Sequence, residues 1–115
     1  MGVDLVRRRD SKKWACNNAL WRFIINSAKS EHWKPLGTRP AKSNEEVHDP
    51  TDYLSNNSQI VTPEDAENMC LSLEKFGKQN ELSKVEREII ESFLKWSKRT
   101  DENDVLIDIP GFIIR

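Results

Sequence analysis

The side chains that could carry chemistry are few and scattered in this chain of 115 residues. His48 and Asp49 stand side by side as half of a catalytic pair would, but the stretch around them is polar and resembles a solvated loop. Asp108 lies between Ile107 and Ile109, an apolar setting that can raise a carboxyl pKa and suit a general acid. A surface cap or ion pair explains Asp108 equally simply. We therefore predict no catalytic residue.

The recognised motifs of the common enzyme classes do not occur in the sequence. It has no glycine-rich phosphate-binding loop, no nucleophile elbow, no HExxH helix and no paired-cysteine metal motif. His32 stands alone near an expected helix end, without a second ligand at metal spacing. We predict no cofactor and no metal site. A small enzyme or ligand binder that uses Asn18, Asn56 and Asp108 is an alternative, and it requires these groups to share one pocket.

The remaining candidates for binding are aromatic and amide residues in expected loops: Trp33, Tyr53, Asn56 and Gln59. Tyrosine and tryptophan often carry the binding energy of protein interfaces. Such residues also close the open end of a small helical core. The aromatic residues and the missing enzyme motifs lead us to predict a protein-interaction module. An inhibitor or immunity-type binder is one kind of such a module. Its partner would be another protein.

A basic run from Arg7 to Lys13 could bind nucleic acid, which is a further alternative. The formal net charge of the whole chain is only -1, so no global field attracts polyanions. A solvated loop leading into a helix also explains the run. We expect nucleic acid to be an improbable partner.

Cys16 and Cys70 are far apart and fit two small buried side chains in a reducing compartment, although a disulfide between them is the alternative. We find no secretory signal and no apolar run long enough to span a membrane. The expected location is the cytoplasm, with no membrane contact.

Three helices must position these residues. The first is expected over about 14–31, or from about Ala19 if Asn17 or Asn18 is its cap. The second begins at Thr62-Pro63, where the threonine caps the helix, and should end near Gly77. The third begins at a capping box made by Ser83 and Glu86. Its apolar stripe contains Val85, Ile89, Phe93 and Trp96.

The two ends of the chain are expected to form a small sheet. Val3–Leu5 alternates as a strand does, and Phe112–Ile114 favours a strand that pairs with it. Residues 105–115 are the most apolar part of the chain and should lie inside, with residues 105–109 as a strand or a short helix. Residues 39–52 should form an exposed flexible loop. The prediction is one domain over residues 1–115, α+β but mainly α.

Several motifs together resemble a group of short bacterial proteins of uncharacterised function. They are the opening Met1–Leu5, Trp33-Lys34-Pro35-Leu36-Gly37-Thr38, the run from Tyr53 to Ala66 with its Ser-Asn-x-x-Gln-x-Val-Thr-x-x-Asp-Ala pattern, and Gly111-Phe112. Members of that group have glycine at the position of Ser58. The resemblance implies a bacterial cytosolic origin and supplies no activity.

Overall fold

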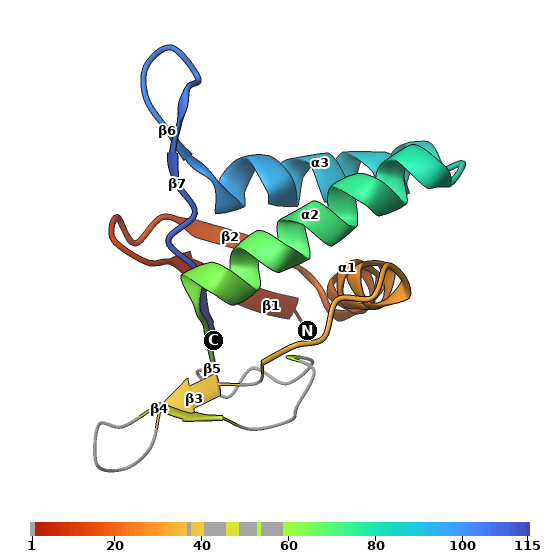
Figure 1. The fold of residues 1–115 in the computed structure, drawn as a ribbon. Coiled ribbons are helices and arrows are strands. Elements are labelled where there is room, and N and C mark those ends of the chain that lie inside the picture. Colours follow the sequence, from red (N-terminus) through yellow and green to blue (C-terminus); the bar gives the residue numbers. More distant parts are fainter. Residues whose placement is uncertain (1, 37, 41–45, 49–52, 54–58) are drawn as a thin grey trace.

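The computed structural model describes residues 2–36, 38–40, 46–48, 53 and 59–115. These residues form α1 (Asn18–Ser30), α2 (Pro63–Gln79) and α3 (Lys84–Ser97). A sheet of six antiparallel strands, in the order β2-β1-β8-β5-β3-β4, accompanies them. The strands are β1 (Gly2–Arg7), β2 (Lys13–Asn17), β3 (Thr38–Pro40), β4 (Glu46–His48), β5 (Gln59–Val61) and β8 (Phe112–Ile114). The α+β prediction with three helices is confirmed (Figure 1).

The two ends of the chain pair in the sheet, as the sequence predicts. Leu5 lies opposite Ile114 and Arg7 lies opposite Phe112. The backbones of Asp4 and Arg115 extend this ladder by two further hydrogen bonds. The sheet is nevertheless larger than predicted, because β5, β3 and β4 come from the middle of the chain.

The expected loop over 39–52 is wrong where the structure describes it. Arg39 and Pro40 belong to β3, and Glu46–His48 form β4, which pairs with β3. Residues 41–45 and 49–52, including Asp49, lie outside the described residues. The polar composition hid these strands because each is only three residues long, and because β4, at the edge of the sheet, needs only one neighbour.

Helix boundaries follow local capping signals. Asn17 caps α1 by accepting from the backbone N of Leu20 at 2.8 Å, so the helix begins at the later of the two predicted starts and residues 13–17 form β2. Thr62 caps α2, and the predicted Ser83–Glu86 capping box is complete. The predicted stop at Gly77 is wrong, because α2 continues to Gln79.

The core fills the space between one face of the sheet and the helices. Val3 and Leu5 of β1 and Phe112 and Ile114 of β8 alternate inward along their strands. The helices add buried side chains: Trp21, Ile24, Ile25 and Ala28 from α1, Ala66, Met69 and Leu73 from α2, and Ile90 and Phe93 from α3. Val85 of the predicted α3 stripe is 61% exposed, so that part of the stripe is wrong.

A separate two-stranded hairpin stands outside this arrangement. Its strands are β6 (Arg99–Thr100) and β7 (Leu106–Asp108). Figure 1 shows it projecting beyond α3, away from the main sheet. The expectation that residues 105–107 lie inside is therefore wrong.

Candidate functional site

The predicted binding aromatics form a buried cluster around one carboxylate. Trp33 Nε1 donates to Asp65 Oδ1 at 2.9 Å, and Tyr53 Oη donates to Asp65 Oδ2 at 2.5 Å. The backbone N of Leu36 donates to the same Oδ2 at 3.1 Å. Asp65 is 1% exposed, so these donors replace the water that the carboxylate loses on folding.

Trp33 and Tyr53 are therefore not displayed at the surface. They are 5% and 0% exposed, and their rings stack with centroids 6.1 Å apart. Trp21 Nε1 donates to the carbonyl of Tyr53 at 2.8 Å, and this contact helps to hold Tyr53 at a φ of 63°. A left-handed tyrosine is sterically costly and persists only where its surroundings fix it. Both side chains tie the chain before α2 to the core, which agrees with the interpretation that such residues close the open end of a small core and not with their display at an interface.

The other predicted binding residues divide between the core and the part that the structure does not describe. Gln59 lies in β5 and is 1% exposed. Asn56 lies outside the described residues. One signal for the cluster was present in the sequence: Asp65 precedes the buried Met69 by four residues, on the same face of α2.

Two groups of the alternative enzyme site, Asn18 and Asp108, are not brought together, and the third, Asn56, lies outside the described residues. Asn18 begins α1 and lines a shallow hollow with Ala19 and Arg22. Asp108 lies at the base of the β6–β7 hairpin and pairs with Arg99 and Arg9. Figure 1 shows α1 and this hairpin on different sides of the molecule.

Neither cysteine has the properties of a nucleophile. Both thiols are free, so the disulfide alternative does not hold in this structure. Burial raises the pKa of each to about 11, and Cys70 also contacts the hydroxyl of Ser97. A protonated thiol reacts slowly. Cys70 is buried as predicted, whereas Cys16 is only half-buried and packs against the margin of the core.

Arg7 of the basic run forms part of the fold, whereas Arg9, Lys12 and Lys13 are exposed. Arg7 is 7% exposed, pairs with Asp10 and donates from Nη1 to the backbone oxygens of Trp96 and Lys98 at 2.6 and 3.2 Å. It thereby binds the carbonyls at the C-terminal end of α3, where a positive charge is favoured. Arg9 pairs with Asp108 at 3.2 Å.

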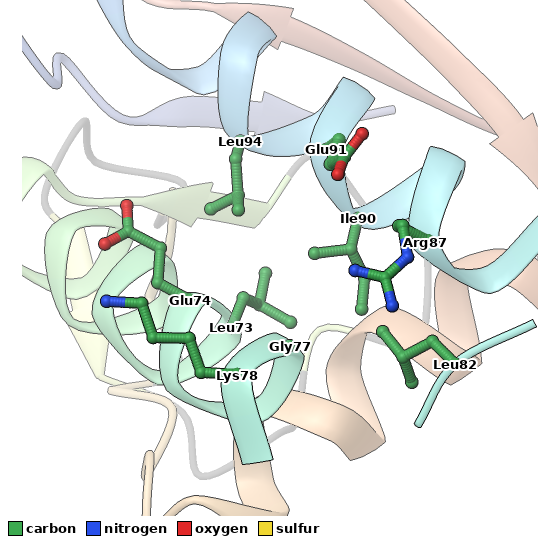
Figure 2. A pocket seen from close by; sticks show the side chains of 9 residues that line it. All are labelled: Leu73, Glu74, Gly77, Lys78, Leu82, Arg87, Ile90, Glu91 and Leu94. Carbon is green, nitrogen blue, oxygen red and sulfur yellow. The ribbon is translucent and has the colours of Figure 1, made fainter. Parts of the chain in front are cut away.

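A groove with an apolar floor lies between α2 and α3. It has a volume of 310 Å³ and is shown in Figure 2. Its floor consists of Leu73, Leu82, Ile90 and Leu94. Four charged side chains surround this floor, namely Glu74, Lys78, Arg87 and Glu91. The arrangement suits an apolar side chain inserted from outside.

The projecting hairpin carries three consecutive large apolar side chains that are exposed to solvent. Val105, Leu106 and Ile107 are 59%, 53% and 56% exposed. Because successive side chains of a strand point to opposite faces, exposure of all three means that both faces of the ribbon are open. Sequence reasoning missed this surface because it equated an apolar run with burial.

The hairpin is held in a defined conformation despite its exposure. At its tip, Asp101 Oδ1 accepts from the backbone N of Asn103 at 2.8 Å and of Val105 at 3.0 Å. At its base, Arg99 Nη1 donates to both oxygens of Asp108, at 3.0 and 3.2 Å. A preformed strand loses less conformational entropy on binding than a flexible one.

Two further properties of the described residues bear on the membrane and metal expectations. None of their helices combines the length and the apolar content needed to cross a bilayer. They also contain no grouping of three or more His, Cys, Asp or Glu side chains placed to hold a metal ion.

Comparisons with protein-family models, with curated proteins and with solved structures yield no match to this chain.

Proposed function

We propose that this chain is a protein-interaction module of the bacterial cytoplasm that binds its partner through the β6–β7 hairpin. The observation that carries the proposal is the exposure of Val105, just before β7, and of Leu106 and Ile107 within β7, on a hairpin that projects from the body. Contiguous exposed apolar side chains on a folded domain commonly mark an interaction site. An inhibitor or immunity-type binder would use such a surface.

The hairpin offers main-chain contacts as well as side chains. Among the described residues, β7 pairs only with β6, so its other edge is open to an added strand. Addition of a strand to such an edge is a recurrent mode of peptide recognition. Asp101, Glu102 and Asp104 make the tip of the hairpin acidic. A partner strand would match the hairpin if its apolar residues lay against β7 and its basic residues lay against this tip.

A photo-crosslinking amino acid at position 106 tests the proposal in the cell that encodes the protein. We expect discrete adducts that disappear when Ile107→Asp is added, because a buried unpaired carboxylate opposes docking. The control places the same amino acid at Leu71, which is 58% exposed on α2 and stands apart from the hairpin. Identical adducts at 106 and 71, or none at 106, would contradict the proposal.

A further inference from the structure

A second hollow lies between the β1–β2 hairpin and the C-terminal part of α3. It has a volume of 370 Å³, and among the described residues that line it every titratable side chain is cationic: Arg7, Lys12, Lys95 and Lys98. A concave site of this size matches the usual range of small-molecule pockets, about 300–1,000 Å³. Because it lacks a lining carboxylate, the hollow selects for negative charge.

Two of the four positive charges are available to a ligand. Arg7 is paired with Asp10 and Lys98 with Glu74. Lys12 and Lys95 are exposed, and no described acidic residue forms an ion pair with either of them. A phosphate monoester carries a charge of about -1.5 to -2 near neutral pH, which two lysines neutralise.

The rest of the described lining consists of two tryptophans and of the hydroxyl side chains Ser92 and Thr100. Trp14 and Trp96 are half-buried and stack with centroids 6.0 Å apart and an interplanar angle of 26°. Their Nε1 atoms already donate within the protein, to Ser92 Oγ at 3.0 Å and to the carbonyl of Lys12 at 3.2 Å. The indoles therefore offer apolar ring surface to a ligand, and no further donors. Flat bases pack well against such surface.

We propose that this hollow binds a nucleoside monophosphate or a similarly built phosphorylated aromatic molecule. The phosphate would lie between Lys12 and Lys95, and the ring would lie against Trp14 and Trp96. The small size of the hollow and the net charge of -1 favour one nucleotide over a nucleic-acid strand, which needs an extended basic surface. This site is separate from the apolar strand of the hairpin and does not depend on the proposed function.

Titration with adenosine monophosphate, read by tryptophan emission, tests the site on the full chain. We expect a saturable change in emission, weaker binding of adenosine or inorganic phosphate alone, and loss of affinity as salt rises. Lys95→Glu and Lys12→Glu should each raise the Kd about tenfold or more, because each replaces attraction by repulsion.

The matched control is Lys75→Glu, an exposed lysine of α2 that does not line the hollow. It makes the same charge change and should leave the Kd within about twofold. Circular dichroism and thermal melts establish that each variant is folded. No saturable signal up to about 10 mM nucleotide, a range that covers weak binding, or equal effects of Lys75→Glu and Lys95→Glu, would overturn the proposal. Tighter binding of a single-stranded oligonucleotide than of the mononucleotide would overturn the assignment to a small ligand.

Discussion

Tyr53 donates a hydrogen bond of 2.5 Å to the carboxylate of Asp65, and both side chains are almost fully buried. The two residues are 12 positions apart, on either side of β5. This single contact ties the chain that enters the sheet to the first turn of α2. Asp65 therefore has two roles, since it also lies in the capping turn that begins at Thr62.

Removal of the Asp65 carboxylate should cost more stability than removal of the Tyr53 hydroxyl. Asp65→Ala leaves three donors without their acceptor, namely Trp33 Nε1, Tyr53 Oη and the backbone N of Leu36. We expect a loss of about 3–5 kcal/mol in the free energy of unfolding. Tyr53→Phe removes one donor and should cost about 1.5–3 kcal/mol. Urea denaturation measures both, and equal losses would contradict the central role of Asp65.

Gly111 and Gly77 should respond in opposite ways to replacement by alanine. Gly111 has a φ of 81°, and a Cβ there would lie 2.3 Å from the carbonyl oxygen of Val61. Gly111→Ala should therefore destabilise by about 2 kcal/mol or more. Gly77 lies inside α2, and a Cβ added there would meet nothing within 4 Å, so Gly77→Ala should stabilise by about 0.5–1 kcal/mol. Thermal melts of the two variants check both signs.

Asp10 should make stability depend on pH in the acid range. The hydrogen bond from Arg7 lowers the pKa of Asp10 from 3.8 to about 2, so the folded state holds the ionised form more tightly than the unfolded state. The resulting stabilisation is complete above the unfolded pKa of 3.8 and is lost as pH falls toward 2. Asp10→Asn should cost about 1 kcal/mol at pH 7.

Unfolding curves at pH 6 and pH 2 test this sign for Asp10. The wild-type protein should be more stable than Asp10→Asn at pH 6, and the difference should shrink at pH 2. Glu88→Gln on the surface of α3 is a suitable control, since Glu88 has only a contact of 4.0 Å with Lys84. A difference that stays constant with pH would exclude the ion pair as its cause.

The cysteines should be almost inert in the folded protein. With a pKa of about 11, each thiol is ionised to only about 0.1% at pH 8. Cys70, which is 2% exposed, should react with a thiol reagent only as fast as the protein opens, whereas the partly exposed Cys16 should react first. Mass spectrometry after timed alkylation separates the two sites. Faster labelling of Cys70 than of Cys16 would contradict the structure.

Local signals in the sequence determined the helices and their starts. Asn17, Thr62 and Ser83 each place a side-chain acceptor where the first turn of a helix has free backbone N–H groups. The pairing of the chain ends was also predictable, because Val3–Leu5 and Phe112–Ile114 carry the apolar and β-branched side chains that suit strands. The helix starts, and the tendency of each chain end to form a strand, depend on residues close to one another in sequence.

Only the tertiary structure decided which side chains are hidden and which are displayed. Tyr53 precedes β5 and Asp65 lies in the capping turn of α2, and both carry polar groups. They are nevertheless buried, because they satisfy each other across 12 residues. Val105–Ile107 is the reverse case, since its base is fixed by the Arg99–Asp108 ion pair and carries the apolar strand outward. Burial is a property of where distant segments meet, and composition alone does not encode that meeting.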